Sequence, residues 1–518
     1  MNFFKKTIPE YIQLSLEQLE EKPQDWLSLY ANAYQVLNYQ NQKMIVRLGN
    51  IGNDYLSTMN IPQIIKAGER WRNYTSMLWS IDWQNIDIQT ISDYFFKKDG
   101  YVSLLIMGCF HSSGYFREKC LNILVDYPNT LVFIMIRMND WVEEVRDKAY
   151  ALSYWRISES LLDELIDASY VFIKLKKSKR RQQAQLDDIE KHYIKRLSKL
   201  LIELNIHNFM QKDECIRKAF YQITLEYGLL SYQLIEELLN IEKNSFCLLL
   251  ITKSFLQSDE MNQDKLYTYL HHLNFYVRKE AMLCYYERNQ RIWKGIENDL
   301  LDKSHAIREY VRFLLKKHTQ INILEYYHDH LPDPIAILGI SEVGTSQDID
   351  ILLPYLESEQ ERIVKVTIQA LSRLMKEKGQ DIYWRFLLDE RMTLSKAAFQ
   401  SIKKNKVHYT AQVVYETYQK VSIEHHSRYL LMILLEEDSW ERLPYLLELY
   451  HYPYEKMRQL IHLRVNQRNP YKKVSKQLKE KIMNSLMNQK NDIPHNVQKS
   501  ILFDLKFVCK DEVKLDEV

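Results

Sequence analysis

The sequence is poor in the two residues that most often break helices. The chain has 518 residues, of which only 11 are glycine and 11 are proline. Each type makes up about 2% of the chain, against usual frequencies of about 7% and 5%. This scarcity disfavours sandwiches, barrels and glycine-rich nucleotide loops, and it predicts long helices with short connections. Because single cores stop growing at about 250 to 300 residues, we expect several domains or an extended array of repeats.

Cysteine is also scarce, and the cysteines lie far apart. No two of them form a CxxC pair. This spacing disfavours both a zinc cluster and a dense disulfide framework, so we expect buried, reduced thiols. The six residues are Cys109, Cys120, Cys215, Cys247, Cys284 and Cys509.

Long hydrophobic runs and an excess of charge of one sign are both missing. The first residues turn polar before the apolar segment of a signal peptide develops. The apolar stretch from Tyr101 to Phe110 is shorter than the roughly 20 residues that span a bilayer. The chain has 70 basic and 68 acidic residues, so as a whole it is no polycation that coats nucleic acid. We expect a cytoplasmic protein without a membrane span.

One short pattern recurs along the chain at intervals of about 30 residues. It consists of an apolar residue, an arginine, two variable residues and a small or apolar residue, as in Val277-Arg278-x-x-Ala281. The apolar residues of each copy follow the stripe that one face of a helix buries. Two helices in so short a unit cannot bury their faces alone, so neighbouring units must stack. The repeated cationic positions are Arg117, Arg146, Arg217, Arg278, Arg308, Lys365, Arg428 and Arg458.

This pattern resembles the short HEAT repeats of bilin-lyase-like proteins, and residues 335–374 show it best. The resemblance implies an all-α fold, an α-α superhelix of stacked antiparallel helix pairs. It also implies that the eight cations form a structural ladder with acidic residues near the repeat boundaries, such as Asp140, Asp302 and Glu359. A lyase for a bound chromophore is a third functional hypothesis, and only the type of repeat favours it.

The repeat pattern predicts three segments. Residues 1–100 do not follow the period and are expected to form an atypical helical cap, with a helix boundary at Asn60-Ile61-Pro62. Residues 101–470 form the predicted repeat array, with a charged insertion near residues 174–200. Residues 471–518 are expected to form a C-terminal helical cap and a charged tail.

The stretch Gly339 to Ser346, GISEVGTS, contains two glycines at the separation found in a P-loop. Thr345 stands where the phosphate-binding lysine must lie, and a helix rather than a strand comes before it, so a P-loop is excluded. We interpret the stretch as a turn between the two helices of one repeat. We expect Gly344 to adopt a left-handed conformation that ends a helix, and Gly339 to allow a tight helix contact.

Histidine patterns for metal binding are missing as well. Di-iron hydroxylases built from similar repeats need His-Glu pairs, and the chain has no His-Glu dipeptide. The adjacent pairs His271-His272 and His425-His426 would point about 100° apart on a helix. We expect them to be surface residues rather than ligands, and we expect no metal and no cofactor.

A basic run precedes a group of acidic residues in the predicted insertion. We favour a solvated helical face whose cations pair with the acids that follow. The alternative is a contact with a phosphate backbone or an acidic protein. The basic residues are Lys174, Lys176, Lys177, Lys179, Arg180 and Arg181, and the acids are Asp187, Asp188 and Glu190.

A tryptophan pair lies in the predicted N-terminal cap. Trp79 and Trp83 flank Asp82. This combination resembles the HEAT-like alkylpurine DNA glycosylases, in which aromatic residues cradle a damaged nucleotide and an aspartate stabilises the developing cation. The i,i+4 spacing of the tryptophans favours instead a place in the core of the cap.

Two functional hypotheses from different classes follow. The favoured one is a non-enzymatic solenoid that binds a protein partner along its concave groove through polar and aromatic side chains. The alternative is a nucleic-acid-binding or DNA base-repair protein that uses the basic run and the Trp79, Asp82 and Trp83 region. No set of residues predicts a nucleophile with its base, so we expect no catalytic residues.

Overall fold

The computed structural model describes residues 7–76, 81–178, 182–489 and 492–508. These residues form α-helices and short 3-10 helices, and they contain no strand. The fold is therefore all-α, an array of packed helical repeats, as the sequence predicts. The chain divides into two compact units, Met1–Gln290 and Arg291–Val518. The three segments expected from the sequence stay a prediction.

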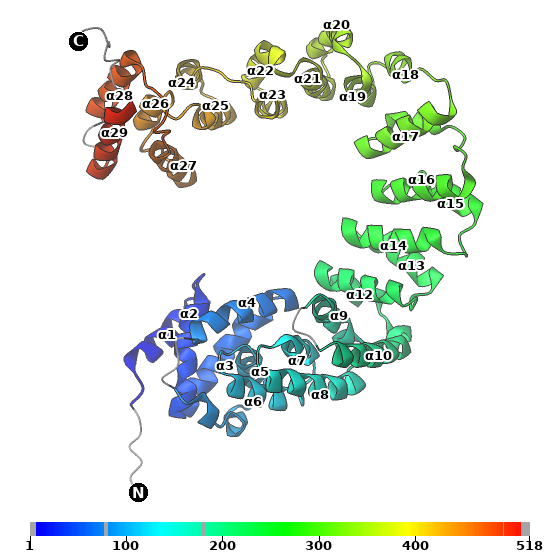
Figure 1. The fold of residues 1–518 in the computed structure, drawn as a ribbon, viewed down its shortest axis with the longest axis vertical. Coiled ribbons are helices and arrows are strands. Elements are labelled where there is room, and N and C mark those ends of the chain that lie inside the picture. Colours follow the sequence, from blue (N-terminus) through cyan, green and yellow to red (C-terminus); the bar gives the residue numbers. More distant parts are fainter. Residues whose placement is uncertain (1–6, 77–80, 179–181, 490–491, 509–518) are drawn as a thin grey trace, which may run out of the picture. The chain divides into compact units, whose positions relative to one another are not determined.

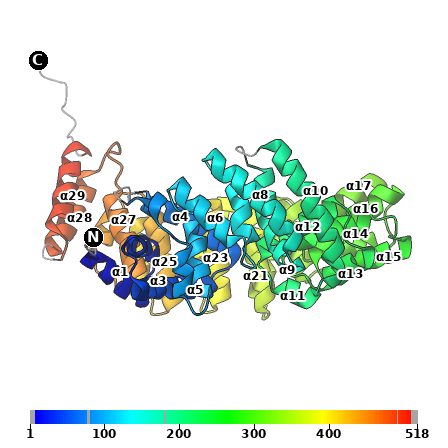
Figure 2. The ribbon, with the colours of Figure 1, turned by 90° about the horizontal axis from the view of Figure 1, so that it is seen from below.

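The first unit consists of helix pairs that stack on one another. Its α-helices are α1 (Glu10–Glu20), α2 (Trp26–Tyr34), α3 (Gln42–Ser57), α4 (Ile61–Thr75), α5 (Asp99–Gly108), α6 (Gly114–Leu124), α7 (Leu131–Met135), α8 (Glu143–Glu159), α9 (Leu162–Lys176), α10 (Gln183–Leu200), α11 (Ile206–Gln211), α12 (Glu214–Glu226), α13 (Tyr232–Ile241), α14 (Ser245–Gln257), α15 (Gln263–Tyr269) and α16 (Phe275–Asn289). Its 3-10 helices are η1 (Gln35–Tyr39), η2 (Trp83–Asn85), η3 (Thr90–Tyr94), η4 (Ile136–Asn139) and η5 (Leu201–Glu203). Helices α12, α14 and α16 pack side by side, and α13 and α15 each pair with the helix that follows them (Figure 1). The same order is seen in the turned view (Figure 2).

Side-chain caps fix where these helices begin. Asn60 accepts a hydrogen bond from the backbone N–H of Gln63, the Gln63 side chain binds the Asn60 N–H in return, and Pro62 lies in the first turn of α4. The helix boundary predicted at Asn60 is thereby confirmed. Asn244 and Asn274 are also N-caps: their side chains accept hydrogen bonds from backbone N–H groups in the first turns of α14 and α16.

The predicted insertion near residues 174–200 contains an additional helix, α10, which packs on both α8 and α9. Its buried residues are Leu186, Ile189, Tyr193 and Leu197, one stripe of the helix. The Tyr193 hydroxyl donates to the backbone oxygen of Leu165 at 2.7 Å. The insertion therefore makes this repeat a three-helix unit.

Aromatic residues fill the core near the start of the first unit. Trp71 lies 5.0 Å from Tyr34, and Trp83 lies 6.0 Å from the same ring, between ring centroids. Trp83 is only 5% exposed, so the prediction that it belongs to the core is confirmed. Trp79 lies outside the described residues.

One hydrogen bond joins parts of the first unit that are far apart in sequence. The Asn60 side-chain amide donates to the Asp213 carboxylate at 2.7 Å, across 153 residues. Both residues are N-caps, of α4 and α12. The first unit therefore has a long-range contact in addition to the neighbour contacts of a repeat array.

The second unit repeats the pairing of helices. Its α-helices are α17 (His305–His318), α18 (Ile323–Asp329), α19 (Pro334–Val343), α20 (Ile349–Leu352), α21 (Glu361–Met375), α22 (Gln380–Leu387), α23 (Met392–Asn405), α24 (Ala411–Lys420), α25 (Glu424–Glu436), α26 (Leu443–Glu448), α27 (Glu455–Asn466), α28 (Lys476–Asn488) and α29 (His495–Val508). Its 3-10 helices are η6 (Ile296–Leu301), η7 (Ser346–Asp348), η8 (Leu353–Glu357) and η9 (Lys376–Gly379). Helices α19, α21, α23 and α25 stack in sequence, while α18, α22 and α24 each pair with the helix that follows.

The stretch GISEVGTS ends a helix and begins a turn. Its first five residues are the last residues of α19, so only Gly344 and Thr345 separate this helix from η7. A Cβ added at Gly339 would lie 2.3 Å from Cε1 of Tyr327. The predicted close contact at Gly339 is confirmed.

The prediction of a left-handed Gly344 is wrong. Its φ is −77° and its ψ is 179°, which any residue adopts. The glycine is required by space instead, because a Cβ there would lie 2.7 Å from a carboxylate oxygen of Asp348. That carboxylate accepts a hydrogen bond from the Thr345 N–H at 2.7 Å and closes the turn.

Candidate functional site

Six of the eight predicted ladder residues occupy one structural position, four residues after the N-cap of their helix. Arg117 follows the N-cap Ser113, and Arg278 follows the N-cap Asn274. Arg278 donates to the backbone oxygens of His272 and Leu273, at 2.6 and 2.8 Å. The arginine thus folds back and binds the turn that precedes its own helix. The six residues, which all donate to such carbonyls, are Arg117, Arg146, Arg217, Arg278, Arg308 and Arg458.

Three of these arginines also pair with a carboxylate of the next helix pair. Arg117 binds Asp140 at 2.6 Å, with both side chains fully buried. Arg217 binds both oxygens of Glu242 at 3.0 Å. Burial alone would raise the pKa of Asp140, but the guanidinium groups of Arg117 and Arg137 outweigh it and hold that pKa below its usual range. These pairs link successive repeats.

Arg308 meets its carboxylate, Glu342, inside the GISEVG stretch. Glu342 also binds Arg312 at 2.6 Å and Arg373 at 3.1 Å. Burial alone would raise the pKa of Glu342, but Arg308 and Arg312 hold it below its usual range. Two further acids were expected in the ladder. Asp302 accepts the backbone N–H of Ser304 at 2.7 Å, and Glu359 is exposed.

Lys365 and Arg428 do not occupy the ladder position, so their assignment to the ladder is corrected. The N-caps of α21 and α25 are Gln360 and Ile423, which places both cations five residues after the cap. One residue is about 100° of rotation on a helix, and both side chains are consequently exposed. The sequence pattern missed this because it could not locate the N-cap.

The described part of the basic run lies at the end of α9. Lys176 pairs with Glu190 of α10 at 2.8 Å and with Glu226 of α12 at 2.9 Å. Lys174 and Lys177 are exposed, and the Lys174 amine lies 5.3 Å from the Tyr170 ring centroid. Pairing with an acid of the following helix agrees with the favoured interpretation. Lys179, Arg180 and Arg181 lie outside the described residues.

Asp82 and Trp83, which the sequence suggested as one site, lie apart: the aspartate is on the surface and the tryptophan is in the core. Asp82 is exposed and caps η2 by accepting the Gln84 N–H at 3.2 Å. Trp83 instead packs against buried His111, with ring centroids 4.1 Å apart. Burial, together with Arg117 and Arg72, lowers the pKa of His111 to about 3. This histidine therefore packs as a neutral ring in the core, and the sequence pattern did not single it out.

Metal-binding and membrane-spanning features are absent from the part of the chain that the structure describes. No group of three His, Cys, Asp or Glu residues there could hold a metal ion, and no helix has the length and hydropathy of a membrane span.

His426 is buried rather than on the surface, because its Nε2 bonds the Asp389 backbone oxygen at 2.8 Å. Cys215 is exposed, contrary to expectation, since it lies in the first turn of α12.

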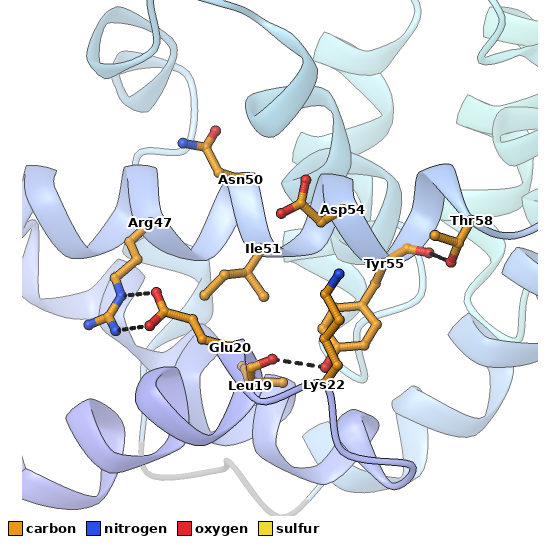
Figure 3. Close-up of a pocket in the computed structure, with 9 residues that line it drawn as sticks. All are labelled: Leu19, Glu20, Lys22, Arg47, Asn50, Ile51, Asp54, Tyr55 and Thr58. Carbon is orange, nitrogen blue, oxygen red and sulfur yellow. Dashed lines mark hydrogen bonds and ion pairs between the residues drawn. The ribbon is translucent and has the colours of Figure 1, made fainter.

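An N-terminal groove of about 430 Å³ lies between the end of α1 and one stripe of α3 (Figure 3). Leu19, Ile51 and Tyr55 form its apolar floor, and the Tyr55 hydroxyl donates to the Leu19 backbone oxygen at 2.9 Å. The Tyr55 ring stacks on Trp26 at 4.5 Å. The polar lining residues are Glu20, Lys22, Arg47, Asn50, Asp54 and Thr58.

A larger tyrosine groove, of about 610 Å³, lies on two successive helix pairs of the second unit, α24/α25 and α26/α27. Three tyrosines line it: Tyr418 of α24, and Tyr452 and Tyr454 of the turn before α27. Arg458 holds this turn by donating to the Tyr452 backbone oxygen at 3.3 Å. Burial and the neighbouring Tyr452 raise the pKa of Tyr418 to about 12, so its hydroxyl stays protonated at neutral pH.

Charges of both signs surround the tyrosine groove. Arg428 and Lys456 supply cations, and Glu424 and Glu448 supply carboxylates. All four side chains are exposed, although Glu448 also accepts the Tyr415 hydroxyl at 2.7 Å. Arg428 is outside the ladder and lines a surface groove, where its guanidinium also donates to the Tyr429 hydroxyl at 3.4 Å. In the sequence, only the aromatic turn His451-Tyr452-Pro453-Tyr454 could have indicated this site.

No family model matches the chain, and no curated protein matches it.

Proposed function

We propose that this protein is a non-enzymatic scaffold of HEAT-type helical repeats, and that it binds a segment of a protein partner in the tyrosine groove of its second unit. The observation that carries the proposal is the groove itself, which combines three tyrosines with exposed charges of both signs across two helix pairs. Tyrosine and arginine are enriched where protein partners bind most strongly. Surfaces that extend over neighbouring repeats are the usual binding sites of solenoid proteins.

The ion-paired carboxylates of the ladder are suited to a structural role. Asp140, Glu242 and Glu342 have pKa values below their usual range, and each carboxylate is held by arginines of the ladder. Depressed carboxylate pKa values suit permanent ion pairs, whereas a general acid needs a raised one. These networks therefore stabilise the repeats and leave the carboxylates no free proton to transfer.

The HEAT assignment is supported by the recurring arginine. Six copies occupy the same helical position and bind the turn before their own helix. A repeated local device of this kind is expected where each repeat contacts only its neighbours.

Nucleic-acid binding remains the alternative hypothesis, but the described residues favour it less. Lys176 is already paired with two glutamates, and Trp83 is in the core. A nucleic-acid site needs free cations or exposed aromatic faces.

The test is capture of the partner from the host cells by the tagged full-length protein, with and without nuclease. A double variant, Tyr454→Ala with Arg428→Ala, removes an aromatic and a cation of the groove, both exposed. The matched control is Tyr115→Ala with Lys365→Ala, an exposed tyrosine and an exposed cation outside the groove. We expect one stoichiometric protein that survives nuclease, drops at least tenfold in the groove variant and is unchanged in the control.

Two results would contradict the proposal. Loss of every partner on nuclease treatment would favour the nucleic-acid hypothesis. Equal recovery by the groove variant and the control would show that the partner binds elsewhere.

A further inference from the structure

The charges around the N-terminal groove fall into a paired set and an unpaired set. Arg47 and Glu20 bind each other through two hydrogen bonds of 2.7 Å (Figure 3). This bidentate pair neutralises itself and forms one wall of the groove. Lys22 and Asp54 lie at the other end, and neither forms an ion pair within the described residues. One cation and one anion therefore remain for a ligand.

The apolar floor lies between these unpaired charges. Figure 3 shows the Lys22 side chain ending beside Tyr55, and Asp54 of α3 lines the same groove. Ile51 lies in the middle of the groove. No ion pair joins Lys22 to Asp54 within the described residues, and both line the groove.

Lys22 follows the last turn of α1. Its φ is 54°, the left-handed conformation that commonly ends a helix. The turn is held by the Lys22 N–H, which donates to the Leu19 backbone oxygen at 3.1 Å.

We infer that the N-terminal groove binds a small zwitterion with an apolar body, in which the ligand carboxylate meets Lys22 and the ligand ammonium meets Asp54. The apolar part rests on Ile51 and Tyr55. Asn50 and Thr58 line the same groove and supply further hydrogen-bonding groups. This chemistry is shared by free apolar amino acids and by short peptides with both ends free.

The volume of the groove agrees with this class of ligand. About 430 Å³ lies in the range of roughly 300 to 1,000 Å³ that small-molecule sites occupy. A short peptide fills more of this space than a free amino acid does. The site lies wholly in the first unit, so it is independent of the proposed partner groove.

The test is calorimetric titration of the full-length protein with leucine and with leucyl-leucine, which separates the two sources. Leucyl-leucine is also tested with its amine acetylated and with its carboxylate amidated. We expect the free dipeptide to bind, and each blocked form to bind about tenfold more weakly, because each loses one charge-assisted contact. If leucine binds and leucyl-leucine does not, the ligand is a free amino acid.

Two variants assign the contacts. In Asp54→Asn, acetylation of the dipeptide should no longer weaken binding, and in Lys22→Gln amidation should no longer weaken it. Lys66→Gln and Asp93→Asn, exposed charges of the same unit outside the groove, should behave like the unaltered protein. Because Asp54→Asn leaves the turn at Lys22 intact, it gives an answer even if Lys22→Gln perturbs the fold.

The inference is overturned by any of three results. The first is no heat of binding for either free ligand at 10 mM, a concentration of about 100 times a Kd of 0.1 mM. The second is equal affinity for free and blocked dipeptides. The third is that acetylation or amidation of the dipeptide weakens binding to the groove variants as much as it weakens binding to the unaltered protein.

Discussion

The arginine that binds the turn before its own helix recurs in both units, but three successive stacked helices of the second unit lack it; Arg308 and Arg458 are its copies in that unit. In the first unit, Arg117, Arg146, Arg217 and Arg278 bind the turn from the fourth position after the N-cap. In α21, α23 and α25 of the second unit, Val364, Ser395 and Ser427 take that position. Arg428 lies one residue further on and lines the tyrosine groove. A shift of one residue thus separates a cation that holds the fold from one that faces a surface groove.

Removing a ladder carboxylate should have the largest effect, in whichever unit it lies. Asp140→Ala leaves Arg117 and Arg137 buried without their anion, and Glu342→Ala does the same to Arg308 and Arg312. We expect each to lower the free energy of unfolding by about 3 to 5 kcal/mol. Denaturant unfolding measures the loss, and hydrogen exchange by mass spectrometry locates it.

The helices in which hydrogen exchange becomes faster should differ between the two variants, since each carboxylate lies in a different unit. Faster exchange should appear around α6 and α8 for Asp140→Ala, and around α17 and α19 for Glu342→Ala. Asp126→Ala changes an exposed acid two residues after the end of α6; it serves as the control and should change neither quantity. A loss below 1 kcal/mol for both ladder variants would show that these ion pairs do not hold the repeats together.

Low pH should destabilise the protein by protonating the same carboxylates. Arginine partners hold the folded-state pKa values of Asp140, Glu242 and Glu342 below their usual range. The stabilisation is therefore complete above the unfolded value of about 4 and is lost as the pH falls through the lower folded values. Urea unfolding between pH 7 and pH 3 should show this decline.

Two of these three carboxylates lie in the first unit, so its peptides should lose hydrogen-exchange protection at low pH before those of the second unit. In Glu342→Gln the decline with acid should be shallower in α17 and α19 alone. Stability that rises on acidification would contradict the assignment.

Close glycine contacts should have the next largest effect. A Cβ at Gly339 would meet the Tyr327 ring at 2.3 Å, and one at Gly68 would meet the Phe110 ring at 2.5 Å. Gly339→Ala in the second unit and Gly68→Ala in the first should each cost about 1 to 3 kcal/mol through overpacking. Gly114→Ala, whose nearest neighbour would lie at 3.2 Å, is the control for thermal unfolding and should cost less than either.

The smallest loss of stability is expected on removing single cations, one at the ladder position and one outside it. Arg278→Ala removes hydrogen bonds to two backbone oxygens and should cost about 1 to 2 kcal/mol. Lys365→Ala removes an exposed side chain and should change stability by less than about 0.5 kcal/mol. Equal losses in denaturant unfolding would mean that the position after the N-cap does not decide the role of the cation.

Local rules in the sequence predicted much of the fold. Asn60 and Pro62 start α4 because capping and a fixed proline φ act within a few residues. The regular spacing of the arginines predicted the stacked helix pairs, because each repeat carries an apolar helix face that only a neighbouring repeat can bury. Gly339 was predicted correctly because it depends on close packing of neighbouring helices, whereas Gly344 was not, since its constraint comes from the Asp348 side chain.

The grooves could not be predicted in the same way. Lys22 and Asp54 lie 32 positions apart, and only the packing of α1 against α3 brings them to one space. Arg428 looked like a ladder residue because the sequence does not show that Ile423 is the N-cap. Binding surfaces depend on contacts between elements, which a single sequence does not specify.

Position-specific photocrosslinking in the host cells tests the central claim most directly. A benzophenone amino acid is placed at Tyr454, which is 64% exposed in the tyrosine groove, or at Tyr115, which is 62% exposed in the first unit. The account predicts a discrete protein adduct from position 454 and none of that mass from position 115. Equal adducts at both positions, or an adduct at 454 that nuclease removes, would contradict it.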